Sequence, residues 1–214
     1  MKALKTISLA IAIGIGATKI FAQPQKQTTT KANLQGNPEY VVHLVAKATM
    51  QEDGSVAQGQ TLRTFEYTYY PNGNLKEMKN ITSTGKIRYI YQYNYDTNNN
   101  ETIRTELDDS KQIVQNRICN YENNRMSSLF VYNKDNQIET KNIYSYNIDG
   151  FIEKELCYQK EELVKTIVYQ RDENGNMLLQ SDIFPDSNTI KIRICRYNQQ
   201  NQMIEDIKNI KLIK

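Results

Sequence analysis

The sequence Tyr146-Asn147-Ile148-Asp149-Gly150-Phe151-Ile152 decides the fold, because it closes one run of strand-forming residues and opens the next. An aromatic residue comes before a turn rich in Asn, Asp and Gly, and an aliphatic residue follows the turn. The same order returns at Tyr69-Tyr-Pro-Asn-Gly-Asn-Leu75 and at Tyr197-Asn-Gln-Gln-Asn-Gln-Met203, and it returns with arginine in place of the aromatic residue at Arg171-Asp-Glu-Asn-Gly-Asn-Met177. Such turns between runs of Tyr, Ile, Val and Thr are typical of β-hairpins.

The turns recur at a fixed interval. The anchor residues that precede them are Tyr69, Tyr95, Tyr121, Tyr146, Arg171 and Tyr197, and their separations are 26, 26, 25, 25 and 26 residues. A second polar cluster lies halfway between successive anchors, as at Asp108-Asp-Ser-Lys111 and Asn133-Lys-Asp-Asn136. A constant period in this range predicts a repeat architecture, in which each unit buries its apolar surface against its neighbours.

Each repeat contains two strand-forming segments and two turns, and this pattern defines the fold class. The sequence predicts an all-β protein, an antiparallel meander of six or seven two-stranded repeats of about 25 residues that forms an elongated twisted sheet. A degenerate first repeat is expected from Val41 to Val56. The turn after Tyr95 is expected to be longer than the others and the turn after Tyr121 shorter. The pattern leaves open whether the sheet closes on itself.

The N-terminal residues predict export. Lys2 and Lys5 precede the apolar run from Ile7 to Ala17, and small residues follow it, which is the order of a secretory signal peptide. We therefore expect a signal peptide at 1–22, a flexible leader at 23–38 and the β-repeat domain at 39–214. The apolar run is short for a membrane span, so no transmembrane segment is expected in the mature chain. The predicted location is periplasmic, cell-surface or extracellular.

Charge argues against a nucleic-acid partner. The whole chain has a formal net charge of +3, but residues 1–22 hold three lysines and no acid, which leaves 24 basic and 24 acidic residues after removal of the signal peptide. Nucleic-acid binding requires an excess of clustered Lys and Arg. The balanced mature chain lacks that excess.

Reactive and metal-binding residues are sparse. His43 is the single histidine and lies in an apolar run, where a structural role is more common than a catalytic one. Cys119, Cys157 and Cys195 are spaced too widely across a meander to be bridged, so three free thiols are expected. No zinc motif is present, and the Asn/Asp-rich turns do not match a calcium loop. We expect no catalytic residue, no metal and no cofactor.

Tyrosine is the distinctive surface residue, with 15 Tyr and no Trp in the chain. Period-two alternation places tyrosines two residues apart on one face of the sheet. The candidate ligand-binding residues are Tyr69, Tyr93, Tyr95, Tyr144, Tyr146 and Tyr197. Their rings could instead be a structural ladder between strands, and this alternative stays open. A binding role would suit an extended glycan or peptide, because aromatic rings with polar tips would recur at each repeat.

These turn units resemble degenerate tyrosine-aspartate repeats of the kind found in Rhs-type secreted proteins. Together with the signal peptide and the composition rich in Asn, Lys and Ile, the chain is similar to small exported proteins of unknown function from gut Bacteroidetes. The resemblance covers about residues 40 to 210 and implies a β-repeat architecture. It implies no catalytic residue.

The expected function is that of a secreted or periplasmic binding or scaffold module without catalytic activity. Its partner would be a glycan or a protein, and exposed edge strands could also let the chain associate with itself. The alternative is a hydrolase that acts on envelope or host polymers. An acid/base pair of carboxylates would be needed for that chemistry, and the candidate pairs, such as Asp108-Asp109, fall in predicted turns.

Overall fold

The computed structural model describes residues 7–8, 39–52 and 55–213. The strands are β1 (Ile7–Ser8), β2 (Tyr40–Met50), β3 (Val56–Tyr69), β4 (Leu75–Thr82), β5 (Ile87–Tyr95), β6 (Glu101–Leu107), β7 (Ile113–Glu122), β8 (Arg125–Asn133), β9 (Ile138–Tyr146), β10 (Ile152–Gln159), β11 (Glu162–Arg171), β12 (Met177–Phe184), β13 (Thr189–Tyr197) and β14 (Met203–Ile213). The signal peptide and leader predicted at 1–38 lie outside the described residues, apart from Ile7 and Ser8, which pair in parallel with β2.

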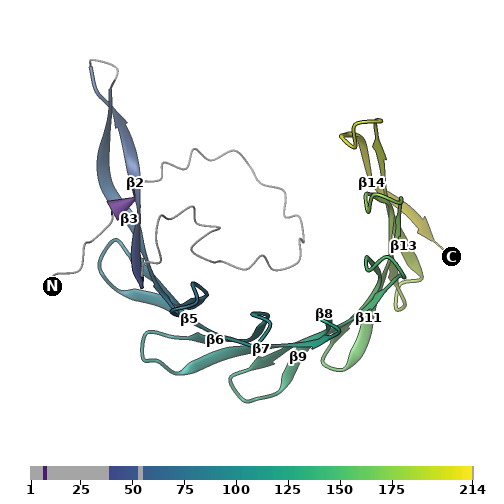
Figure 1. The fold of residues 1–214 in the computed structure, drawn as a ribbon, viewed down its shortest axis with the longest axis horizontal. Helices are drawn as coiled ribbons and strands as arrows, with labels where there is room; N and C mark the ends of the chain where they lie inside the picture. Colours follow the sequence, from purple (N-terminus) through teal and green to yellow (C-terminus); the bar gives the residue numbers. More distant parts are fainter. Residues whose placement is uncertain (1–6, 9–38, 53–54, 214) are drawn as a thin grey trace. The chain divides into compact units, whose positions relative to one another are not determined.

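The strands follow one another in the sheet in the order of the sequence. The order is linear from β1 to β14, and consecutive strands from β2 onward form antiparallel neighbours joined by short turns (Figure 1). This confirms the prediction of an all-β antiparallel meander, with 13 strands from β2 to β14 in the described part of the chain. The degenerate first repeat is present as β2 and β3. The elongated form of the whole sheet stays a prediction.

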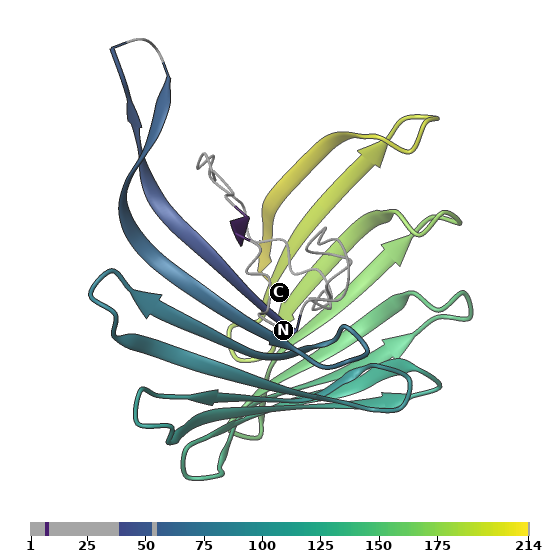
Figure 2. The ribbon, with the colours of Figure 1, turned by 60° about the vertical axis from the view of Figure 1, so that its left-hand side comes forward.

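Contacts divide the chain into two compact units, residues 1–116 and residues 117–214, with the division inside β7. In each of them the strands form a single layer, as Figure 2 shows. Neither face is covered by a second sheet or by a helix in the described residues, so the side chains on both faces must provide their own packing.

The register is constant at five of the six anchors. Tyr69 pairs with Leu75, Tyr95 with Glu101, Tyr146 with Ile152, Arg171 with Met177 and Tyr197 with Met203, so the partner always lies six residues after the anchor. A register shift accompanies the anchor in each of these pairs, which adds one residue to one strand and increases the local twist.

The prediction of a longer turn after Tyr95 is wrong. The backbone N–H of Asp96 donates to the carbonyl of Asn100 at 2.9 Å, and β6 already begins at Glu101. The polar residues Glu101 and Thr102 had suggested a loop, but pairing with β5 keeps them in the strand. The turn after Tyr121 is indeed shorter, because only Asn123 and Asn124 separate β7 from β8.

Most turns share one design, which Asp172 illustrates. Its Oδ1 accepts hydrogen bonds from the backbone N–H groups of Asn174 at 3.0 Å and Asn176 at 2.8 Å. Gly175 adopts φ +81°, the left-handed conformation that ends a three-residue hairpin loop. The same pattern recurs with Asp96, Asp108, Asn133 and Asn198 as the accepting residue. The Asn/Asp-rich composition of the turns is therefore explained by side chains that replace backbone acceptors.

Two turns have only two residues. Asn123 and Asn124 adopt φ values of 50° and 61°, which asparagine tolerates well. Lys160 and Glu161 adopt φ values of 46° and 69°, in a left-handed region that long side chains occupy at a cost. Pairing of β10 with β11 maintains this strained turn.

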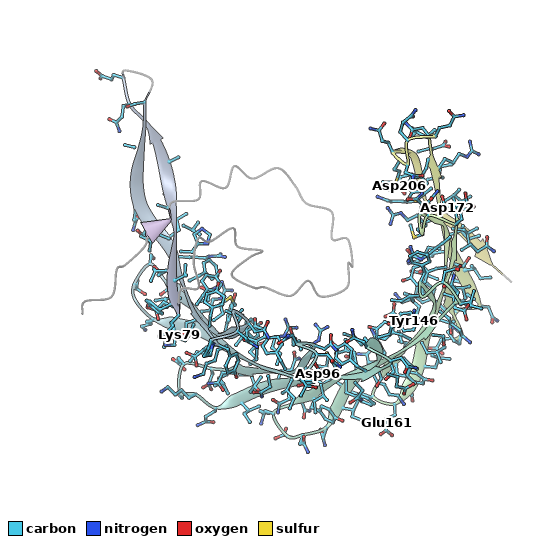
Figure 3. The ribbon with its side chains drawn as sticks, viewed as in Figure 1. Lys79, Asp96, Tyr146, Glu161, Asp172 and Asp206 are labelled. Carbon is cyan, nitrogen blue, oxygen red and sulfur yellow. The ribbon has the colours of Figure 1, made fainter. Side chains whose placement is uncertain are left out.

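The core of the first unit lies on both faces of its sheet. On one face, Val41, Tyr69, Leu75 and Tyr93 are buried together, and Tyr67, Met78, Tyr91 and Tyr95 pack against them. On the other face Ile90 pairs with Leu107, and both side chains are buried. Figure 3 shows the side chains that stand on both faces of the strands. Alternation along β5 thus gives aromatic packing on one face and aliphatic packing on the other.

In the second unit the buried side chains include Cys119, Ile167 and Cys195. Cys119, Cys157 and Cys195 form no disulfide, as their spacing across the meander predicts. Cys119 lies on β7 and Cys157 on β10, and their separation by three strands follows from the meander. The thiols act as small apolar side chains in the sheet.

Candidate ligand-binding face

The six candidate tyrosines differ in exposure. Tyr69 and Tyr93 are only 7% and 9% exposed, and they belong to the core of the first unit. Tyr95 packs against that core and is half-buried. In the second unit Tyr144, Tyr146 and Tyr197 are half-buried. A ligand-binding role stays a prediction for all six, and their exposure makes the residues of the second unit the better candidates.

Three of the six anchor side chains bond to the backbone of the preceding repeat. The hydroxyl of Tyr95 donates to the carbonyl of Leu75 at 2.9 Å, and the hydroxyl of Tyr146 donates to the carbonyl of Met126 at 2.8 Å. Arg171 replaces tyrosine at the fifth anchor, and its Nε donates to the carbonyl of Ile152 at 3.4 Å. The donated bond therefore persists where the side chain changes, which explains why arginine fits the pattern.

We call the position two residues before each anchor the pre-anchor position. The pre-anchor residues are Tyr67, Tyr93, Cys119, Tyr144, Tyr169 and Cys195. Burial raises the pKa of Tyr93 to about 12 and that of Tyr144 to about 12, and the charge of Glu155 contributes to the rise at Tyr144. Both phenols are therefore neutral hydrogen-bonding groups at physiological pH.

A partly open depression lies beside Tyr144 and Tyr146 in the second unit. Its volume is about 160 Å³, and its lining residues are Glu122, Asn123, Arg125, Ser127, Tyr144 and Tyr146. The two-residue turn between β7 and β8 supplies Asn123, and β8 supplies Arg125 and Ser127. Two of the candidate tyrosines thus share a concave surface with hydroxyl, amide, carboxylate and guanidinium groups.

Next to this depression, Glu155 of β10 is held by its neighbours on the sheet. Its Oε1 accepts a hydrogen bond from Nδ2 of Asn142 at 2.8 Å, and its Oε2 accepts one from the hydroxyl of Tyr169 at 3.5 Å. Burial raises the pKa of Glu155, although the charge of Lys165 opposes the rise. Burial and the Glu155 carboxylate also raise the pKa of the Cys157 thiol to about 12, so this cysteine is a poor nucleophile.

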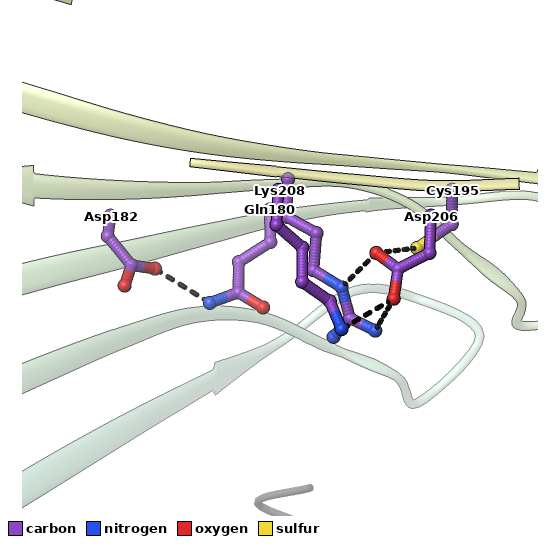
Figure 4. Close-up of polar contacts among 6 residues, drawn as sticks. Gln180, Asp182, Cys195, Asp206 and Lys208 are labelled. Atoms are coloured by element: carbon purple, nitrogen blue, oxygen red, sulfur yellow. Dashed lines mark hydrogen bonds and ion pairs between the residues drawn. The ribbon is translucent and has the colours of Figure 1, made fainter. Parts of the chain in front are cut away.

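Two separate groups of polar contacts lie nearer to β14 (Figure 4). Gln180 donates to Asp182 at 2.7 Å, and Arg193 makes a two-point contact with Asp206, at 2.8 Å from Nε and 2.9 Å from Nη2. Lys208 lies 2.8 Å from the same carboxylate. The hydrogen bonds from Arg193 and then from Lys208 hold the pKa of Asp206 far below its usual value. In this part of the face, the Asp206 carboxylate is therefore paired with cations of the sheet itself.

The turn carboxylates are engaged by N–H donors. Asp172 accepts bonds from two backbone N–H groups and from Nδ2 of Asn176, and these bonds lower its pKa. An oxygen that already accepts from N–H groups is a poor ligand for a cation. Among the residues that the structure describes, no group of three or more His, Cys, Asp or Glu side chains could hold a metal ion. The described part of the chain also contains no helix with the length and apolarity that a membrane span requires.

Two Asn-x-Thr sequences begin at Asn80 and Asn100, and both asparagine side chains serve the fold. Asn80 is 2% exposed and its Nδ2 donates to the hydroxyl of Tyr89 at 2.8 Å. Asn100 is 9% exposed and its Nδ2 donates to Asp96 at 3.0 Å. Neither amide is open to modification in the folded chain.

Sequence reasoning missed several residues of this face. Tyr169 could have been found from the period, because it lies two residues before the anchor Arg171. Arg125 carried no signal, because its contacts are made with residues of the following repeat. Glu155 and Asp206 also lacked a motif, since only the register of neighbouring strands places them beside the pre-anchor residues.

No protein-family model matches this chain. One curated relative, the small heat shock protein hspF of Dictyostelium discoideum, is 26% identical over 110 residues. The match covers 45% of this chain, and the chain spans 47% of the length of that relative.

The chain is similar in structure to several solved proteins. It matches the Photorhabdus luminescens Tc holotoxin pore with 12% identity and a TM-score of 0.42, over 80% of this chain and 11% of the toxin chain. It matches a porin-like protein from Bacteroides uniformis with 13% identity and a TM-score of 0.42, over 80% and 77% of the two chains. A protein of unknown function from Bacteroides fragilis matches with 14% identity and a TM-score of 0.22, over 78% and 92%. Function must therefore be argued from the residues of this chain.

Proposed function

We propose that this chain is an exported binding module that holds an extended glycan at the tyrosine face of its second unit. The observation that carries the proposal is the depression at Tyr144 and Tyr146, which combines aromatic rings with groups that can donate and accept hydrogen bonds. Sugar rings present both apolar C–H faces and hydroxyl groups, and tyrosine offers an apolar ring with a polar tip.

The size of the depression favours a polymer over a free small molecule. Ligand pockets commonly have volumes of about 300 to 1,000 Å³, whereas this depression has about 160 Å³. A site this small can accept one residue of a chain whose other residues lie on the surrounding surface. The repeated strand pattern on both sides of the depression offers that surface.

The compartment supports the same proposal. The predicted signal peptide at 1–22 would deliver the chain to the periplasm, the cell surface or the exterior, where polymeric glycans are accessible. We also propose membership among small exported tyrosine-aspartate-type repeat proteins, on the basis of the anchor period and of the turn sequences.

A glycan array tests the proposal directly. The full chain should bind at least one extended glycan, and Tyr144→Phe should weaken that binding several-fold because it removes a hydroxyl from the depression while the ring remains. Tyr169→Phe is the matched control, since it makes the same change at the next pre-anchor position, outside the lining residues. Equal loss in both variants would contradict the assignment. Binding to peptides with no glycan binding would point to a protein partner instead.

The same experiment separates binding from hydrolysis. A binding module leaves the bound glycan intact, so prolonged incubation should release no new reducing ends. Release that depends on Glu155 would establish the alternative, a hydrolase, because this carboxyl group has a raised pKa beside the depression.

A further inference from the structure

Arg125 is held in place at the depression by contacts that leave its charge unneutralised. Its guanidinium lies over the ring of Tyr146, with 5.7 Å between the guanidinium carbon and the ring centroid. The ring itself is fixed, because the Tyr146 hydroxyl bonds to the carbonyl of Met126. A cation over an aromatic face gains electrostatic attraction without losing its positive charge.

Gly150 completes this arrangement from the next turn. It adopts φ +87°, and a Cβ built at this position would overlap Nη2 and Cζ of Arg125. The guanidinium therefore packs against the backbone of Gly150, in space that any other residue would fill. Two features of separate elements, the Tyr146 ring and the Gly150 backbone, thus fix the direction of one arginine.

Arg125 differs in this respect from Arg193 and Arg196 of the same unit, whereas Arg171, like Arg125, bonds to no carboxylate in the described part of the chain. Arg193 pairs with Asp206 at 2.8 Å and Arg196 pairs with Glu205 at 3.0 Å. Among the described residues no carboxylate lies within ion-pair distance of Arg125, and the residue is exposed. An oriented guanidinium without a counter-ion presents parallel N–H groups that suit a carboxylate.

The remaining lining residues suit hydroxyl groups. Ser127 and Tyr144 can each donate and accept a hydrogen bond, and Asn123 can do both through its amide. Glu122 can only accept when it is ionised, so it favours a hydroxyl and disfavours a second anionic group. The depression therefore offers one place for an anion and several for hydroxyls.

We propose that the depression binds a glycan residue that carries a carboxylate, a uronic acid, with its carboxylate against Arg125 and its hydroxyls toward Asn123, Ser127 and Tyr144. This inference rests on the proposed glycan-binding function and assigns its substrate class. Arg125 acts as the specificity-determining residue, because a neutral sugar of the same shape gains nothing from the guanidinium charge.

The test compares oligosaccharides of galacturonate, glucuronate and mannuronate with their methyl esters, which keep the ring and hydroxyls but lack the charge. Isothermal titration of the full chain should show at least one acid form that binds ten-fold or more tightly than its ester. Arg125→Met keeps much of the apolar stem and removes the charge, so it should abolish this preference while the melting temperature stays within a few degrees. Arg125→Lys keeps the positive charge, so it should keep part of the preference for the acid form.

Arg196→Met serves as the matched control, since it removes an exposed arginine away from the depression, and it should leave the preference unchanged. Equal affinity for acid and ester, or a preference that survives Arg125→Met, overturns the uronate assignment. If neutral glycans still bind and Tyr144→Phe still weakens their binding, the proposed glycan-binding function stands without the uronate assignment. If no uronate oligosaccharide binds, the assignment is also wrong, and the glycan array decides the function separately.

Discussion

At the scale of single residues, three of the six anchors share one structural role. Tyr95 and Tyr146 donate their hydroxyl hydrogens to backbone carbonyls about 20 residues earlier, and Arg171 reproduces the bond with its guanidinium. The carbonyls of Leu75 and Ile152 follow the preceding turn, where a register shift interrupts the regular ladder. These three anchors therefore link successive repeats by hydrogen bonds as well as by packing.

Removal of one anchor hydroxyl should be measurable. Tyr146→Phe leaves the carbonyl of Met126 without its donor, and we expect the free energy of unfolding to fall by about 1 kcal/mol. Urea denaturation followed by circular dichroism measures the change. Tyr132→Phe is the control, because the Tyr132 hydroxyl makes no hydrogen bond within the described residues, and it should change stability by much less. Equal effects of the two substitutions would contradict the role of the anchor.

Asp206 predicts how stability responds to acid. Its folded pKa lies below the value of about 3.9 of an unfolded aspartate, so the carboxylate contributes stability above about pH 4. That contribution is lost as the pH falls from 4 toward the folded pKa. The stability difference between the wild-type chain and Asp206→Asn should therefore be largest near pH 6 and should shrink by pH 2. Urea midpoints at several pH values test this, and a difference that does not vary with pH would refute it.

At the scale of elements, the three-residue loop is the structural unit that sets the period. An Asp or Asn side chain accepts from the backbone at the start of most of these loops, and a left-handed residue closes them. Within the described residues, glycine occupies the closing position in four turns and asparagine or lysine in others, as at Asn99 and Lys111. The loop can therefore persist while its sequence drifts, which explains the degenerate appearance of the repeats.

Substitution of two of these glycines distinguishes the cost of backbone strain from the cost of a packing clash. A Cβ at Gly175 would lie 2.5 Å from ring atoms of Phe151, whereas a Cβ at Gly85 would meet no heavy atom within 4 Å. Both residues have φ near +80°, so each substitution to Ala carries a strain cost of about 1 kcal/mol. Gly175→Ala should cost at least about 1 kcal/mol more than Gly85→Ala, because the Phe151 ring must move. Equal losses in urea unfolding would show that the ring contact does not matter.

The strands and turns could be predicted from the sequence where neighbouring residues alone decide the backbone conformation. Strands around Ile90 and Ile167 follow from β-branched and aromatic residues, and the period follows from the turns. The prediction was wrong for the turn after Tyr95, because Glu101 and Thr102 are polar and only pairing with β5 keeps them extended. Of the candidate site, the sequence supplied Tyr144 and Tyr146 but not Arg125, whose position depends on Gly150 in the next repeat.

At the scale of the whole molecule, β14 is the last strand of the sheet within the described residues. Met203 and Ile204 at the start of this strand are 51% and 65% exposed. An edge strand with exposed apolar residues can pair with another chain. Exposed edges are thus the expected route to self-association, as the repeat pattern had suggested.

This expectation is tested by sedimentation over a range of protein concentrations. The wild-type chain should show a concentration-dependent increase in mass, and Ile204→Lys should reduce it because a charge at an edge opposes strand pairing. Ile148→Lys is the control, since Ile148 is 98% exposed in the turn between β9 and β10. A wild-type monomer at all concentrations would contradict edge pairing.

The central claim, that the depression of the second unit is the ligand site, is tested most directly by hydrogen–deuterium exchange with and without the glycan that the array identifies. Bound glycan should slow amide exchange in residues 122–127 and 144–151, which contain the lining residues and the turn of Gly150. Residues 162–171, which carry the equivalent tyrosine of the next repeat, should change much less. Slower exchange confined to 65–69 and 89–95, with none at 122–127, would contradict the account and return the ligand site to the tyrosines of the first unit.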